Sequence, residues 1–288
     1  MYAFLIQPFA DYGFMRQALI GTLLLALGTA PAGVFLMLRR MSLAGDAMAH
    51  AVLPGAAVAY LLFGLALVPM TIGGLVAGLA VALGAGAVSR LTVQNEDASM
   101  AAFYLISLAA GVLIISLRGS SVDLMHVLFG TVLALEADAI LLIGAISLLT
   151  LALLALFWRG LVAECLDPLF LRSVSGIGGY VHFLFLMLVV LNLVSGFQAL
   201  GTLLSVGMMM LPALAARFWT NRVLTMCALA VAIGMVSGTC GLLLSYHASL
   251  PSGPAIVLFA GGFYLVSLVA GRRGLIFSRL RPHRHRVA

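Results

Sequence analysis

Long runs of apolar residues, separated by short polar segments, make up most of the 288-residue chain. A transmembrane helix needs about 20 mainly apolar residues, and nine runs approach that length. A further apolar segment, at about 122–134, is too short to cross and predicts a re-entrant or interfacial helix. The pattern therefore predicts an all-α, polytopic membrane bundle with about eight or nine transmembrane helices. The nine runs are 17–38, 44–64, 70–89, 98–117, 138–157, 179–195, 197–217, 223–245 and 253–271.

Composition supports the membrane assignment. The chain is 64% hydrophobic and only 8% charged, whereas a soluble domain carries about 25% charged residues. This excludes a soluble enzyme or a soluble binding module. The first 14 residues lack the basic segment of a cleavable signal peptide, so we expect the first span itself to direct insertion. A single transmembrane domain over residues 1–288 is predicted.

Arginine placement predicts the orientation. All 15 basic residues are arginines, which gives a formal net charge of +6. If the N-terminus faces outward and nine spans alternate, only Arg16 and Arg118 lie outside, and every other arginine faces the cytoplasm. This distribution follows the positive-inside rule. The basic tail at 272–288 is then a cytoplasmic membrane anchor.

One polar pair interrupts the second apolar run. Asp46 and His50 are four residues apart, so both fall on one face of a helix. Ionisable groups within a membrane span cost about 2.5–3.5 kcal/mol for the charged types, and a carboxylate with an imidazole is half of a transition-metal site. The alternative is structural, with Asp46 capping the helix and His50 packing in the core.

A polar stretch at about 159–178 separates the fifth and sixth runs. Asp167 followed by Pro168 predicts the start of a helix, and Gly176 or Gly178 would end it. We therefore expect a short amphipathic helix at about 167–175 on the cytoplasmic face. It is either a plain connector or a docking element for a cytoplasmic partner.

Other candidates have simpler readings. Acidic and histidine side chains near the 122–134 segment could form an outer vestibule that concentrates cations, although solvated loops would look the same. Met208, Met209 and Met210 are consecutive, cannot share one helix face, and are expected to pack in the core. The three cysteines lack paired or CxxC spacing. The vestibule candidates are Asp123, His126, Glu136, Asp138 and His247.

Several blocks in the same order resemble the permease subunits of bacterial zinc/manganese ABC importers. The segment 39–55, which carries Asp46 and His50, is similar to the family's signature at the second helix. Further blocks that resemble the family are 122–130, 167–176, 201–217 and 251–254. The resemblance implies a single permease domain over 1–288 that moves a divalent ion by alternating access.

The resemblance also implies partners and residue roles. Asp46 and His50 match metal-contacting positions, two from each copy of a permease dimer, and Asp167, Pro168 and Arg172 fall in the ATPase-coupling segment. There is no Walker A loop and no lysine, so ATP is expected on a separate ATPase chain. A periplasmic or lipid-anchored metal-binding protein would deliver Zn²⁺ or Mn²⁺. No permanently bound cofactor is expected, and affinity order favours zinc.

Other functions stay open from the sequence. An ABC permease for a metal chelate such as a siderophore would need no Asp/His pair. A proton-coupled secondary transporter could use Asp46 and His50 as a relay. An intramembrane enzyme needs a catalytic constellation, and the chain has neither a His-Glu-x-x-His motif nor a Gly-x-Ser-x-Gly elbow. The sequence therefore predicts a transporter subunit of the bacterial inner membrane, with the C-terminus cytoplasmic.

Overall fold

The computed structural model describes residues 6–64, 66–117, 132, 135–166 and 178–276. These residues form a bundle of long helices, and eight segments are long and apolar enough to cross a membrane. The second of these segments combines two helices, α4 and α5. The helices are α2 (Gln7–Asp11), α3 (Gly13–Leu38), α4 (Ala44–Ala51), α5 (Leu53–Phe63), α6 (Leu67–Leu91), α7 (Glu96–Leu117), α9 (Ala137–Leu156), α10 (Trp158–Leu166), α12 (Gly178–Leu200), α13 (Thr202–Arg217), α14 (Val223–Ala248) and α15 (Ser252–Ala270).

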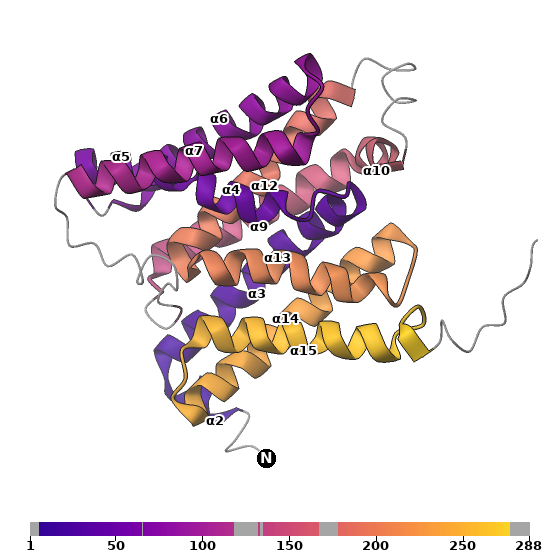
Figure 1. Cartoon of the computed structure of the whole chain (residues 1–288). Helices are drawn as coiled ribbons and strands as arrows, with labels where there is room; N and C mark the ends of the chain where they lie inside the picture. The colour runs from indigo at the N-terminus through magenta and orange to yellow at the C-terminus, as the bar shows by residue number, and fades with distance from the viewer. Residues whose placement is uncertain (1–5, 65, 118–131, 133–134, 167–177, 277–288) are drawn as a thin grey trace, which may run out of the picture.

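The shorter helix α13 supplies a ninth apolar helix of 16 residues. It forms antiparallel hairpins with α12 before it and α14 after it (Figure 1). The prediction of eight or nine transmembrane helices is therefore confirmed. The predicted start of this span at 197 was wrong, because α12 continues to Leu200 and the chain turns at Gly201, whose φ of 92° suits glycine.

Tight helix contacts hold the bundle together. Helix α3 packs against α9, α13 and α14, and α5 packs along α6 (Figure 1). A side chain at Gly33 of α3 would overlap the backbone carbonyl of Met209 in α13. Gly55 of α5 and Gly73 of α6 face each other in the same way, backbone against backbone. Small residues allow such close approach in lipid, where packing drives helix association.

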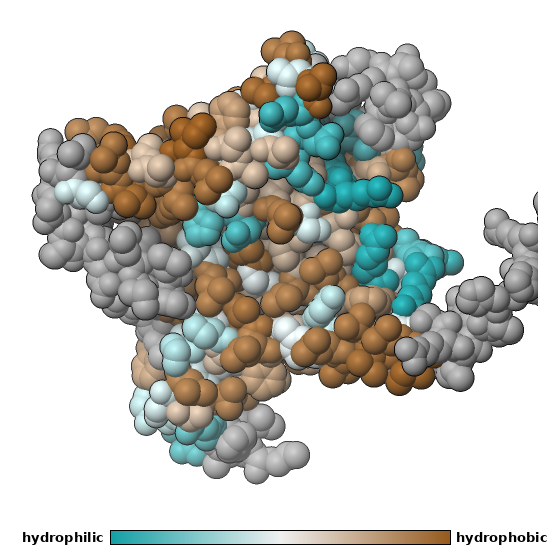
Figure 2. Space-filling model, in the orientation of Figure 1, coloured by the Kyte–Doolittle hydropathy of each residue, from teal (hydrophilic) through white to brown (hydrophobic). Residues whose placement is uncertain are grey.

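The surface has the distribution expected for a membrane protein. Hydrophobic side chains cover most of the face shown in Figure 2. Hydrophilic side chains gather mainly at one edge of that view, near the α6–α7 and α13–α14 connections of Figure 1. Arg40, Arg217 and Arg222 are exposed on the connections between helices. We call this side of the bundle the basic end.

An elbow at Arg39 and Arg40 joins α3 to α4. The amide of Met41 donates to the Leu36 carbonyl, and the amide of Arg40 donates to the Met37 carbonyl. These two bonds form a Schellman motif, which requires a left-handed residue at its penultimate position. Arg40 takes that conformation, with a φ of 61°. The elbow therefore ends α3 sharply and turns Arg39 and Arg40 to different environments.

Some predicted features lie outside the described residues. These are almost all of the 122–134 segment, the 167–175 helix and most of the basic tail. Just before the expected 167–175 helix, the described chain forms α10, which had not been predicted as a separate helix. The candidate site residues outside the described ranges are Asp123, His126, Asp167, Pro168 and Arg172.

Candidate functional site

Asp46 and His50 lie on the single polar face of the short helix α4. The other described faces of α4 are formed mainly by small side chains and Met48, which are buried. The Asp46 side chain is 63% exposed and the His50 side chain is 26% exposed. Helix α4 lies within the bundle, in contact with α6, α7, α12 and α13 (Figure 1). The pair is therefore accessible on a helix inside the bundle, which is an unusual place for a carboxylate.

The two side chains are close together but are not hydrogen-bonded. His50 Nε2 and Asp46 Oδ1 are 3.7 Å apart, which exceeds hydrogen-bonding distance. Two ligands that each bind a transition metal at about 2.1 Å, at a tetrahedral angle, are about 3.4 Å apart. Small rotations would thus allow both atoms to contact one ion. His50 Nδ1 is buried and makes no hydrogen bond to the described residues.

The helix is interrupted directly after this pair. Helix α4 ends at Ala51, and α5 begins at Leu53 with Pro54 in its first turn. Proline has no amide proton, so Pro54 cannot donate to the carbonyl of His50 as a continuous helix would require. The predicted span over 44–64 corresponds to the membrane segment Ala44–Phe63, which is divided locally at Val52. Val52 keeps helical backbone angles, so the interruption is one residue wide and leaves the His50 carbonyl without its helical donor while the span continues.

One face of α7 supports the interruption. Ser107 Oγ donates to the Ala51 carbonyl at 2.9 Å, which satisfies an acceptor at the end of α4. One turn further, Gly111 fits against the backbone of Pro54. One turn earlier, the Tyr104 ring lies 6.4 Å from the His50 ring. These α7 residues were not predicted as part of the site, because nothing in local spacing connects them to α4.

One chain supplies only part of a metal site. Among the described residues, no group of three or more His, Cys, Asp or Glu side chains is placed to hold a metal ion. Asp46 and His50 give two ligands, whereas a closed zinc site has four. The pair can therefore contact an ion in passing, or complete a site with ligands from a second molecule.

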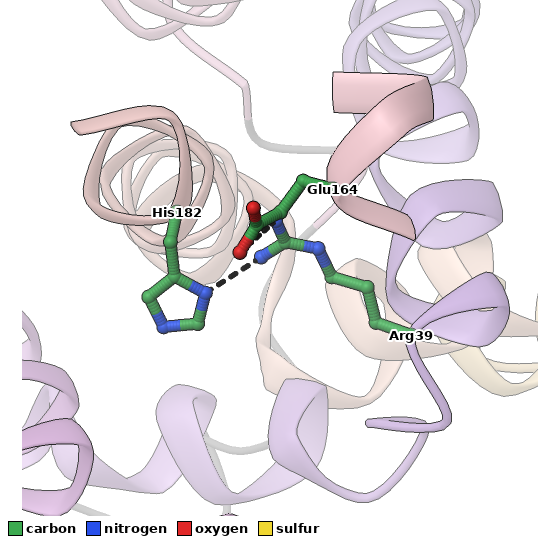
Figure 3. Close-up of polar contacts among 3 residues, drawn as sticks. All are labelled: Arg39, Glu164 and His182. Carbon is green, nitrogen blue, oxygen red and sulfur yellow. Dashed lines mark hydrogen bonds and ion pairs between the residues drawn. The ribbon is translucent and has the colours of Figure 1, made fainter. Parts of the chain in front are cut away.

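A second polar cluster lies at the basic end and was missed by the sequence analysis. Arg39 of α3 extends between Glu164 of α10 and His182 of α12 (Figure 3). Its Nη1 lies 2.9 Å from His182 Nδ1, and its Nη2 lies 3.8 Å from Glu164 Oε1. The guanidinium also stacks on the ring of Phe185, with Cζ 4.6 Å from the centroid. Arg39 had been counted only as one of many cytoplasmic charges.

This cluster is much more buried than the Asp46–His50 pair. The side chains of Arg39 and Glu164 are 6% and 3% exposed. Arginine can only donate hydrogen bonds, so His182 Nδ1 accepts, and His182 is neutral in this arrangement. Burial raises the pKa of the adjacent Cys165 thiol, although the Arg39 guanidinium acts in the opposite direction. A permanent cation between Glu164 and His182 makes this cluster a poor site for a metal cation.

The remaining described candidates stay apart from both clusters. Met208, Met209 and Met210 are buried, as predicted for packing residues. Glu136 and Asp138 are exposed at the start of α9. His247, near the end of α14, has its Nδ1 2.9 Å from the Leu243 carbonyl. The vestibule stays a prediction, since two of its residues lie outside the described ranges.

The family profile of the ABC 3 transport family matches residues 11–271. This chain belongs to that family. It is 35% identical over 275 residues to the manganese transport system membrane protein MntC of Listeria innocua, covering 95% of this chain and 97% of that protein. It is 33% identical over 296 residues to the zinc transport system membrane protein TroC of Treponema pallidum, covering 97% of this chain and 96% of the relative.

The structural comparison agrees. The fold superposes on a chain of PsaBC from Streptococcus pneumoniae, solved in complex with Fab, with a TM-score of 0.85 and 30% identity. The alignment covers 98% of this chain and 100% of that one. The resemblance stated from the sequence is therefore confirmed. As a member of the ABC 3 transport family, the chain is a multi-pass membrane subunit of a transporter and not an enzyme.

Proposed function

We propose that this chain is the permease subunit of an ABC importer for a divalent transition-metal ion, with Asp46 and His50 as transient ligands. The observation that carries the proposal is the open, unbonded pair on α4, with Nε2 and Oδ1 3.7 Å apart beside an interrupted membrane helix. A structural pair would be expected to close into a hydrogen bond or to be buried. A transport site must bind its ion weakly enough to release it.

A second copy of the chain would complete the ligand set. Two copies related by a twofold axis present two carboxylates and two imidazoles. Four such ligands satisfy zinc, and together with water they satisfy manganese. We therefore propose a homodimer in which the two α4 helices face a shared pathway.

The energy for transport would come from a separate ATPase. The positive-inside rule assigns the basic end and the C-terminus to the cytoplasm, where the ATPase would bind. We propose that Asp167, Pro168 and Arg172 belong to the coupling segment that transmits ATP-driven closure. A metal-binding protein on the opposite side would deliver the ion, and the two permeases would expose α4 alternately to each side.

Manganese is the first ion to test. The relative with 35% identity is named for manganese, and the one with 33% identity is named for zinc. Carboxylates suit manganese and imidazoles suit zinc, so the pair accommodates both ions. The preference for zinc expected from the affinity order is not confirmed by these names.

Uptake in a deletion strain tests the proposal. We expect Asp46→Ala and His50→Ala each to lower uptake of radiolabelled Mn²⁺ or Zn²⁺ by at least about tenfold, since loss of even an outer-shell partner costs 10–100-fold in metal affinity. The matched control is Asp97→Ala, which removes the same side chain as Asp46→Ala at an exposed position outside both the pair and the vestibule candidates. Membrane expression and ATPase association should be unchanged in all three variants. Normal uptake by both α4 variants would refute the role of the pair.

The same strain separates the ions and the chelate alternative. Competition between free Mn²⁺ and Zn²⁺ for wild-type uptake ranks the two ions. Growth rescue by an iron chelate with no uptake of either free ion would instead favour a chelate permease.

A further inference from the structure

A charged cavity lies at the basic end of the described chain, away from the Asp46–His50 pair. It has a volume of about 900 Å³ and lies where the ends of α3, α10, α12, α13 and α14 meet. Among its described lining residues, the charged ones are Arg39, Arg40, Arg217 and Glu164. Since His182 is neutral, three arginines and one glutamate leave an excess of two positive charges.

Polar atoms in this cavity lack partners. Arg39 Nε and Nη2 and Glu164 Oε2 are buried without a hydrogen bond to the described residues. The ion pair between Arg39 and Glu164, at 3.8 Å, is too long to satisfy them. Buried polar groups without partners cost about 1–3 kcal/mol each, and charged ones cost more. Figure 3 shows the Arg39 guanidinium between Glu164 and His182, so its positive charge lies in the wall of the cavity.

The position of the cavity indicates where such a ligand comes from. Its walls include α10 and the ends of the apolar helices α3, α12, α13 and α14, and the end of a membrane-spanning helix is where lipid headgroups are expected. Basic pockets between transmembrane helices bind the headgroups of anionic lipids. The cavity is also partly apolar, through Met37, Leu38, Val162 and Leu166, which suits the glycerol and upper acyl part of a lipid.

We propose that this cavity binds the headgroup of an anionic phospholipid, with phosphatidylglycerol as the chemical type. The phosphate oxygens accept hydrogen bonds from Arg40 and Arg217, which are exposed at the cavity, and the buried Arg39 supplies further positive charge. The lipid thereby links α3, α10 and α13 beside the elbow that leads into α4. This inference does not depend on which ion the chain transports.

Thermal unfolding of the full chain in nanodiscs tests the proposal. Phosphatidylglycerol should raise the Tm of the wild-type protein by about 3 °C or more relative to phosphatidylcholine with the same acyl chains. Arg217→Gln and Arg40→Gln should each lose at least half of that shift, because both residues line the cavity. Arg222→Gln is the matched control, an exposed arginine of the same connection that does not line the cavity, and it should keep the full shift.

Native mass spectrometry provides an independent readout. Wild-type protein and Arg222→Gln should retain phosphatidylglycerol adducts, and Arg217→Gln should lose them. Equal shifts and equal adducts in all variants would overturn the proposal. An equal Tm shift from inorganic phosphate in phosphatidylcholine nanodiscs would assign the cavity to a free anion. If the lipid has no effect and Arg217→Gln selectively weakens ATPase binding, the cavity is a protein contact and the proposal is wrong.

Discussion

The Asp46–His50 pair and the Arg39–Glu164–His182 cluster use the same acidic and imidazole chemistry on either side of one elbow, but they differ in burial. The Asp46 carboxylate is 63% exposed, whereas that of Glu164 is 3% exposed. The cluster contains a guanidinium that cannot lose its proton, and the pair contains no arginine. A carboxylate and an imidazole can thus bind a metal cation together only if no arginine lies between them.

Because the two clusters differ in burial, we expect one to affect mainly stability and the other mainly transport. A buried ion pair is sensitive to the loss of one partner, because the remaining charge is left in a medium of low dielectric constant. An exposed pair can lose either side chain with little effect on folding. We therefore expect substitutions in the two clusters to affect different measurements.

The largest expected effect on stability is at Glu164. Glu164→Gln should lower the free energy of unfolding by about 3–5 kcal/mol, since it leaves Arg39 buried without its counter-charge. Denaturation in detergent measures this change. The double variant Arg39→Met with Glu164→Met should recover most of the loss. An unchanged Tm for Glu164→Gln would show that the cluster is no more constrained than the Asp46–His50 pair.

The helices next to the Asp46–His50 pair, α5 and α6, are held together by close backbone packing. Gly73→Ala should lower the free energy of unfolding by about 1–3 kcal/mol, because its new methyl group would meet the backbone of Gly55, just beyond the interruption. Gly86→Ala on the same helix is the control, since a Cβ there meets no atom within 4 Å. Equal Tm values for the two variants would contradict a backbone-to-backbone contact at Gly73.

A smaller effect is expected at Ser107. Ser107→Ala removes the hydrogen bond to the Ala51 carbonyl and should cost about 1 kcal/mol. Uptake should fall, but less than in Asp46→Ala, because both proposed ligands, Asp46 and His50, remain. Ser89→Ala is a suitable comparison, since that hydroxyl bonds only within its own helix, to the Gly86 carbonyl. A loss of uptake in Ser107→Ala as large as in Asp46→Ala would place Ser107 itself among the ligands.

The smallest effect on stability is expected at the pair itself. The double variant Asp46→Asn with His50→Gln should change the free energy of unfolding by about 1 kcal/mol or less, because Asp46 is largely exposed and His50 partly exposed. Metal uptake should be lost. Uptake assays test the loss of transport, and denaturation of the same preparation tests the small change in stability. A destabilisation comparable to that of Glu164→Gln would make the pair structural.

The sequence was sufficient for the spans because the bilayer imposes a local rule. A helix in lipid needs about 20 mainly apolar residues in succession. Each span can therefore be recognised in the sequence as a run of apolar residues. The interruption at Val52 cannot be predicted from the local sequence, because it depends on a hydrogen bond from Ser107 of α7. Without Ser107 at the Ala51 carbonyl, Pro54 alone predicts only a bend.

The two clusters illustrate the same limit. Asp46 and His50 share one helix, so their spacing brought them together before any fold was known. Arg39 and His182 are 143 positions apart in the chain. Nothing in the local sequence distinguishes Arg39 from Arg40, yet the Schellman turn places one in the protein and the other at its surface.

The short helix α13 has a consequence for the membrane itself. Sixteen residues rise about 24 Å, which is about 6 Å less than the thickness of the hydrocarbon core. Ten of these residues are buried against protein, so lipid does not need to deform around them. The polar backbone groups at the ends of α13 are therefore kept from the hydrocarbon by the neighbouring helices and not by the length of α13 itself.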